Sequence, residues 1–175
     1  MKSDRELIDA VNGGDQRAFE QLYARHRDWV YRLAWRFTSR HEDALDVLQE
    51  TFIYLLKKFP GFELTASMTT FLYPVVKHLA LNRLQRRSPD ANSEALLSEM
   101  PAGHAARTSR AELATALGAL PGEQREVVLM RFLDGFSLGE IATALDVPLG
   151  TVKSRLHNAL RTLRDDPRTR DYFLD

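Results

Sequence analysis

The sequence contains no cysteine and no long apolar run, and these absences exclude several classes of protein. Without thiols the chain cannot form disulfides, thiolate zinc sites or a cysteine nucleophile. Its five histidines are scattered and include no HExxH-like pair, so no metal site is predicted. No apolar segment approaches the length that spans a bilayer, and the polar first six residues are unlike a signal peptide. We therefore expect a cytoplasmic protein that does not insert into membranes.

An excess of positive charge, common in small DNA-binding proteins, is also missing, because 24 Lys and Arg residues balance 24 Asp and Glu residues. Residues 1–87 carry 14 basic and 11 acidic side chains, and residues 109–175 carry 9 and 10. Neither part alone is therefore expected to bind DNA tightly. If the protein binds DNA, a partner should supply most of the binding free energy.

The segment from Ser137 to Arg164 has the pattern of a helix-turn-helix. Ser137 and Glu140 form a capping box, and Asp146-Val147-Pro148 ends the first helix. The second helix places its apolar side chains on one stripe: Val152, Leu156, Ala159, Leu160 and Leu163. Its other face carries donors and cations without an acid: Lys153, Ser154, His157, Asn158 and Arg161. Such a helix suits the major groove of DNA; a surface helix with merely solvated cations is the alternative.

Residues that typically begin or end helices recur along the whole chain, and no alternating apolar pattern indicates a sheet. Capping boxes are predicted where a serine is followed three residues later by glutamate: Ser3, Ser39, Ser109 and Ser137. The expected helices span about 3–12, 15–37, 40–59, 69–87, 109–119, 121–133, 137–145 and 148–164. We predict an all-α fold of two small helical domains, 1–87 and 109–165, with a flexible linker at 88–108 and a short tail at 166–175.

The predicted helix at 40–59 has an unusual outer surface. Its core stripe holds Ala44, Leu48, Phe52, Leu55 and Phe59. The opposite side combines acids with large side chains: Asp43, Asp46, Glu50, Ile53, Tyr54 and Lys57, with Gln49 at the edge. Acids beside an exposed isoleucine and tyrosine indicate contact with a basic protein partner. An ordinary acidic helix surface is the alternative.

The predicted helix at 69–87 is apolar almost all round in its first turns, which indicates burial, and its end is basic. The segment from Phe62 to Thr70 before it is predicted to be an exposed loop of aromatic and hydroxyl side chains. Such a loop could hold an unstacked base, although the residues alone favour a structural loop. A helix start at Thr69 or Thr70 would place Pro74 near the end of the first turn, where proline is tolerated.

Three runs of sequence resemble region 2 of the extracytoplasmic-function (ECF) sigma factors: Ala18–Tyr23, Glu42–Phe52 and Thr70–Tyr73. The run Leu117–Arg131 together with the helix-turn-helix, especially Gly150-Thr-Val-Lys-Ser-Arg155, resembles region 4 of the same family. The resemblance covers nearly the whole chain, in the right order and with a linker between.

The resemblance implies a non-enzymatic protein that binds core RNA polymerase (the β′ clamp helices and the β subunit) and promoter DNA, without a cofactor. The residues matching the polymerase-binding surface are Asp46, Gln49, Glu50, Phe52 and Leu56. Those matching the −10 element contacts are Ser67, Thr69, Thr70, Phe71, Lys77, His78 and Asn82. Those matching the −35 contacts are Thr151, Lys153, Ser154, His157 and Asn158, with Arg155, Arg161 and Arg164 as phosphate contacts.

Three residues depart from the family pattern in the −10 segment. Phe71 stands where the family usually has tryptophan, Pro74 where it has arginine or a similar residue, and His78 where it has asparagine.

An anti-sigma factor is a further possible partner that the resemblance implies. Two other functions stay open on the residues: a dimeric helix-turn-helix regulator that binds an operator without polymerase, and an interaction module with a vestigial DNA motif.

Overall fold

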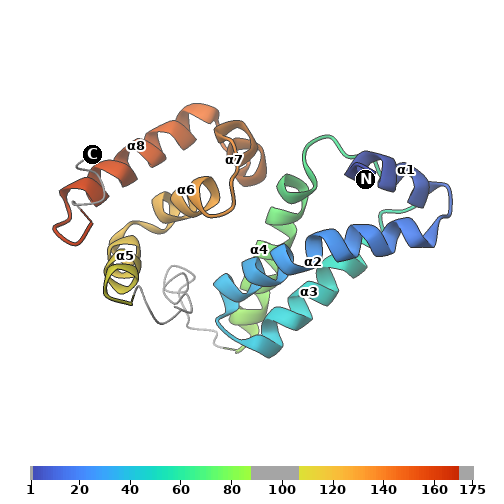
Figure 1. Ribbon diagram of the computed structural model, residues 1–175, viewed down its shortest axis with the longest axis horizontal. Helices are drawn as coiled ribbons and strands as arrows, with labels where there is room; N and C mark the ends of the chain where they lie inside the picture. The colour runs from blue at the N-terminus through green and yellow to red at the C-terminus, as the bar shows by residue number, and fades with distance from the viewer. Residues whose placement is uncertain (1, 88–106, 170–175) are drawn as a thin grey trace. The chain divides into compact units, whose positions relative to one another are not determined.

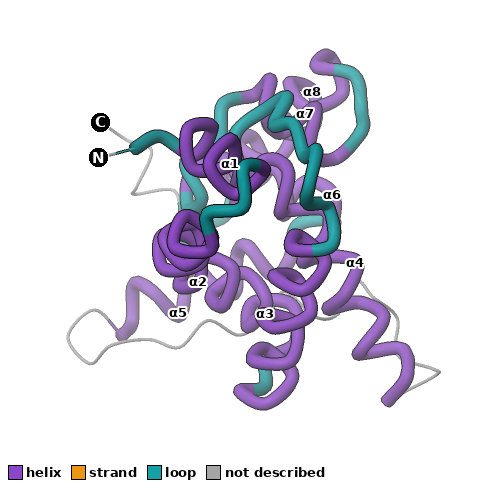
Figure 2. The backbone as a smooth tube through the Cα atoms, turned by 90° about the vertical axis from the view of Figure 1, so that its right-hand side faces the viewer, coloured by secondary structure: helices purple, strands orange, loops and turns teal. Residues whose placement is uncertain are grey.

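The structure, a computed structural model, describes residues 2–87 and 107–169. Within these ranges the chain forms eight helices and no strand, which confirms the predicted all-α fold. Figure 2 shows only helices and loops along the described chain. The chain divides into two units, residues 1–93 and 94–175 (Figure 1). The predicted linker at 88–108 lies outside the described residues except for its last two positions, which belong to a helix.

The described part of the first unit contains four helices: α1 (Asp4–Asn12), α2 (Gln16–Thr38), α3 (His41–Leu56) and α4 (Met68–Arg87). The long α2 packs against the other three helices, and α3 also packs against α4. The largest fully buried side chains come from all four helices: Leu7, Ile8, Leu22, Val30, Leu33, Leu55, Met68, Leu72 and Tyr73. The unit is therefore a helical bundle around one apolar core.

Two of the four predicted capping boxes are present in the structure, at Ser3 and Ser137, where the serine and glutamate bond each other's backbone N–H. The prediction at Ser39 is wrong. Ser39 has φ 53°, in the left-handed region, and its N–H bonds the carbonyl of Trp35, so it ends α2 rather than starting α3. The prediction at Ser109 is also wrong, because α5 begins at Arg107 and Ser109 lies within it.

The helix α4 begins at Met68, one residue before the predicted start, so Pro74 lies in its second turn. Proline has no N–H, and the carbonyl of Thr70 therefore lacks its usual i+4 donor. The helix continues past Pro74 to Arg87, and its buried residues include Leu72, Tyr73, Val76 and Ala80.

The side chain of Asn12, at the end of α1, holds the turn that follows α3. Its Nδ2 donates to the carbonyl of Phe62 over 2.9 Å, and its Oδ1 accepts from the N–H groups of Gly61 (2.7 Å) and Phe62 (3.1 Å). Gly61 has φ +94°, which favours glycine at this turn. A single amide thus joins two segments about fifty residues apart and positions the start of the loop before α4.

Replacing Asn12 with alanine is expected to lower the free energy of unfolding by about 1–3 kcal/mol, because three backbone groups lose their partner and two of these bonds are partly buried. Urea denaturation followed by circular dichroism measures the loss. Asn12→Asp is the matched control, since it keeps the acceptor but not the donor and should lose less. Wild-type stability in the alanine variant would mean that water replaces the amide fully.

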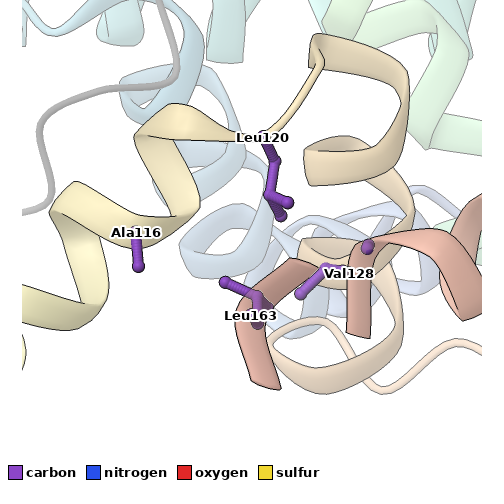
Figure 3. Packing of buried hydrophobic residues seen from close by; sticks show 5 residues of the cluster. Ala116, Leu120, Val128 and Leu163 are labelled. Carbon is purple, nitrogen blue, oxygen red and sulfur yellow. The ribbon is translucent and has the colours of Figure 1, made fainter. Parts of the chain in front are cut away.

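The described part of the second unit also contains four helices: α5 (Arg107–Ala119), α6 (Gly122–Phe132), α7 (Leu138–Leu145) and α8 (Leu149–Asp165). Helix α8 packs against α6 and α7. A core cluster joins α5, α6 and α8 (Figure 3) through Ala116, Leu120, Val128, Ala159 and Leu163. At the α5–α6 junction the guanidinium of Arg125 donates to the carbonyl of Gly118 (2.6 Å), in the last turn of α5, and to that of Leu120 (2.9 Å), which follows the helix.

Candidate nucleic-acid and protein interfaces

The helix-turn-helix predicted from the sequence is formed by α7 and α8. Asp146 ends α7 with φ 52°, a left-handed conformation that aspartate tolerates better than most residues. Pro148 is the N-cap of α8, so the helix begins at Leu149, one residue after the predicted start. The predicted apolar stripe is confirmed, since Val152, Ala159 and Leu163 are buried against the rest of the unit. The short turn therefore fixes α8 with its opposite face outward.

The outward face of α8 carries most of the predicted −35 residues. Four of them are exposed: Lys153, Ser154, His157 and Arg161. Thr151 and Asn158 are half-buried at its edges, and Arg164 extends the exposed face toward the C-terminal end. The hydroxyl of Ser154 donates to the carbonyl of Gly150 over 3.0 Å, which leaves its oxygen free to accept. Donors, acceptors and cations thus lie along one solvent-facing side of the helix.

Arg155 differs from the other predicted phosphate contacts because it pairs within the unit. Its Nη2 lies 2.5 Å from Oε2 of Glu123, in the first turn of α6. The Arg155 side chain is 22% exposed and that of Glu123 71%. The pair therefore joins α8 to α6 at the edge of the outward face, and Arg155 stays available to DNA only if the pair is weak.

A double-mutant cycle of Arg155→Ala and Glu123→Ala is expected to give a coupling energy below about 1 kcal/mol, because Glu123 is exposed and water screens the pair. Chemical denaturation of the two single variants and the double variant measures it. A coupling well above that value would make Arg155 a structural residue and remove it from the set of candidate DNA contacts.

The outer surface of α3 combines acids with exposed apolar side chains. Asp46 and Glu50 are each 45% exposed, and both pair with Arg83 of α4. Gln49 beside them is exposed. Three large apolar residues of the same helix are also exposed: Leu45 (38%), Ile53 (52%) and Leu56 (51%). We call these six residues the α3 surface. Two of them, Leu45 and Ile53, were not in the predicted polymerase-binding set. They are exposed because the helical spacing places Leu45, Gln49, Ile53 and Leu56 on one face.

Two residues assigned to the outer surface of α3 are buried instead: Asp43, and Phe52, which the resemblance placed there although the helical period assigned it to the core stripe. Phe52 is 5% exposed and lies edge-on to the rings of Phe19 and Tyr23 of α2, so it belongs to the core. Asp43 is 7% exposed and lies 3.5 Å from both Arg40 and Arg83. The sequence pattern could not show these partners, because they lie on other turns and other helices.

The prediction of an exposed loop from Phe62 to Thr70 is wrong at three positions. Phe62, Met68 and Thr70 are 8%, 1% and 2% exposed. The Thr70 hydroxyl bonds Oγ of Ser67 over 2.6 Å, and Ser67 also caps the start of α4 through the N–H of Thr70. The buried Thr70 therefore stabilises the loop through its bond to Ser67. Ser67 and Thr69 are half-buried and remain partly accessible.

Half-buried Phe71 continues a chain of aromatic contacts across the unit. Its ring centroid lies 4.8 Å from that of Phe62 and 6.4 Å, in stacked geometry, from that of Tyr54. Further along α4, His78 is exposed, whereas Lys77 and Asn82 are half-buried. The Asn82 amide nitrogen and Nε2 of His78 are 2.8 Å apart. Phe71, His78 and Asn82 thus lie on one accessible part of the helix that follows the loop.

No group of His, Asp and Glu side chains within residues 2–87 and 107–169 is arranged to hold a metal ion. None of the helices in these ranges has the length and apolar character needed to cross a membrane.

The comparisons with known proteins agree for both units. Residues 22–89 match sigma-70 region 2, and residues 110–163 match sigma-70 region 4. The ECF RNA polymerase sigma factor SigM of Mycobacterium tuberculosis is 38% identical over 90% of this chain and 81% of its own length. SigW of Bacillus subtilis is 29% identical over 91% of this chain and 94% of its own. The structure of CnrH in complex with the cytosolic domain of CnrY matches with a TM-score of 0.67 and 27% identity, covering 92% of this chain and 94% of that one. Both regions in one chain, with relatives matched over most of their length, show that the protein belongs to the ECF sigma factors of the sigma-70 family.

Proposed function

We propose that this sigma factor binds core RNA polymerase through the α3 surface. The arrangement of that surface carries the proposal: two half-exposed carboxylates, Asp46 and Glu50, lie beside three exposed apolar side chains on one helix face. Exposed apolar side chains gathered on one face indicate a protein contact, and the acids favour a basic partner. This helix lies within the residues that match sigma-70 region 2. The partner surface we propose is the β′ clamp helices.

Helix α8 is proposed to bind the −35 element in the major groove. Lys153, Ser154 and His157 on its exposed side would contact base edges, with Thr151 and Asn158 at the margin. Arg161 and Arg164 would contact phosphates, which orient the helix without distinguishing bases. The burial of Val152, Ala159 and Leu163 supports this orientation, because only the opposite face is free to meet DNA.

For the −10 element we propose a smaller set of contacts than the sequence alone suggests. Ser67, Thr69 and Phe71 lie at the accessible start of α4, and His78 and Asn82 follow about two and three turns after Phe71. Capturing a base extruded from the melted strand costs a few kcal/mol of unstacking, which contacts of the assembled holoenzyme must offset. Buried Thr70 is assigned to loop structure rather than to DNA contact.

The protein would thus act without catalysing a reaction, by placing core polymerase on two promoter elements. A net charge of zero fits this role, because the polymerase can supply much of the DNA-binding surface. Regulation by a second protein is supported by CnrH, whose structure contains a bound CnrY domain. We propose that an anti-sigma factor could bind this chain in a similar way.

In-vitro transcription tests the proposal directly. Purified core RNA polymerase is supplied with a pool of random promoter sequences, with and without the full-length protein. Specific initiation only in its presence is the expected result, and sequencing the templates that produce transcripts would identify the −35 and −10 elements. The absence of initiation, together with symmetric operator binding by the free protein, would support a dimeric regulator instead. The presence of both sigma regions in the chain does not favour that alternative.

A further inference from the structure

A single arginine of α4 contacts all three acids that line one side of α3. The Nη1 of Arg83 lies 3.0 Å from Oε1 of Glu50, and its Nε lies 3.5 Å from Oδ1 of Asp43. Its Nη2 bonds Oδ2 of Asp46. Each nitrogen of the guanidinium therefore faces a different carboxylate, an arrangement that the planar fork of arginine allows and a lysine ammonium does not reproduce.

The contacts with Arg83 leave one carboxylate oxygen of Asp46 and one of Glu50 available for a partner. Arg83 uses one oxygen of Asp46 and one of Glu50, and in the described part of the chain no bond is made by Oδ1 of Asp46 or Oε2 of Glu50. The arginine side chain is 28% exposed, less than the 45% of either acid, so the carboxylates extend further into solvent than the group that holds them.

We propose that Arg83 is a positioning residue for polymerase binding, an inference that rests on the proposed role of the α3 surface. It holds Asp46 and Glu50 in fixed rotamers, each with one oxygen directed to a basic partner. Side chains ordered before binding lose less conformational entropy when the complex forms. The same contact ties α3 to α4, the helix that carries the −10 candidates His78 and Asn82.

Two opposite effects of removing Arg83 make the proposal testable. Arg83→Gln makes the surface more negative, so association with a basic partner should become faster at low salt. The freed carboxylates must then be ordered on binding, so dissociation should become faster. Ordering a side chain costs a factor of a few in affinity, and for two acids we expect about tenfold faster dissociation.

The experiment measures association and dissociation rates of the full-length protein on immobilised core RNA polymerase, without DNA, at two salt concentrations. Arg86→Gln is the matched control, since it removes the same charge from an exposed site on the same helix. Arg83→Lys restores the positive charge but not the planar guanidinium that contacts three carboxylates. Its association rate should therefore return to the wild-type value while its dissociation stays fast. Circular dichroism and thermal melting confirm that each variant is folded.

Dissociation of Arg83→Gln at the rate of Arg86→Gln would overturn the inference. Tighter binding of Arg83→Gln, with unchanged or slower dissociation, would also overturn it and show that Arg83 shields the acids. Full recovery of both rates in Arg83→Lys would show that charge alone matters and would likewise contradict it. If the wild-type protein itself fails to bind core polymerase, the proposed role of the α3 surface is wrong, which separates that failure from the failure of this inference.

Discussion

Reversing the charge of Asp46 and Glu50 with lysine is expected to abolish binding to core RNA polymerase. Both carboxylates are half-exposed on the α3 surface, and the change replaces attraction for a basic partner with repulsion. The effect on folding should be small, because pairs this exposed are worth under about 1 kcal/mol each, although Arg83 then faces two added cations. Pull-down or interferometry with purified core polymerase measures binding, and thermal melting measures stability.

The double variant Asp9→Lys with Asp28→Lys provides the matched control. It makes the same change in net charge at exposed positions of α1 and α2, outside the six residues of the α3 surface. The control should bind polymerase nearly as the wild type does. The amide variant Asp46→Asn with Glu50→Gln, which preserves shape, should weaken binding without the added repulsion. Wild-type affinity in the lysine variant would remove α3 from the polymerase interface.

On the DNA side, His157→Ala is expected to change which bases are preferred at the −35 element, whereas Arg161→Ala should weaken binding to all sequences. His157 is exposed near the middle of the outward face of α8, where it can reach base edges. A side chain that contacts base edges contributes about 1–3 kcal/mol of discrimination. A phosphate contact instead lowers affinity uniformly and reduces the salt slope by about one.

Both effects are measured with holoenzyme reconstituted from each variant, on a library randomised at the −35 position and at two or more salt concentrations. Exposed Thr162, one residue beyond Arg161, offers a control, since Thr162→Ala leaves every assigned contact in place and should change neither preference nor salt slope. Equal losses on all promoters from the His157 and Arg161 variants would refute the division of roles between them.

The local features of the chain were predictable because they depend on residues a few positions apart. The eight helices follow from apolar periodicity and from breaks at glycine and proline, and their observed ends differ from the predicted ones by up to three residues. The capping boxes at Ser3 and Ser137 form as their sequences require. The same pattern fails at Ser39 because the chain must turn sharply between α2 and α3, which the left-handed conformation of that residue provides.

The candidate surfaces were predictable only in part, for a related reason. On α8 the helical period separates the buried stripe from Lys153, His157 and Arg161, and the structure keeps that separation. On α3 the period correctly exposes Asp46 and Glu50 but cannot show which other helix covers Asp43. A face on a helix can be assigned from the sequence, whereas its neighbours cannot.

By itself, then, the sequence determined the helices, the helix-turn-helix with its outward basic face, and the similarity to both sigma-factor regions. Tertiary structure alone decided that Thr70 is buried, that Arg155 pairs with Glu123, and that Arg83 binds the acids of α3. The physical reason is distance along the chain. Periodicity and capping act within a turn or two, but burial and ion pairing depend on side chains such as Arg83 and Glu50, thirty-three positions apart, that only packing brings together.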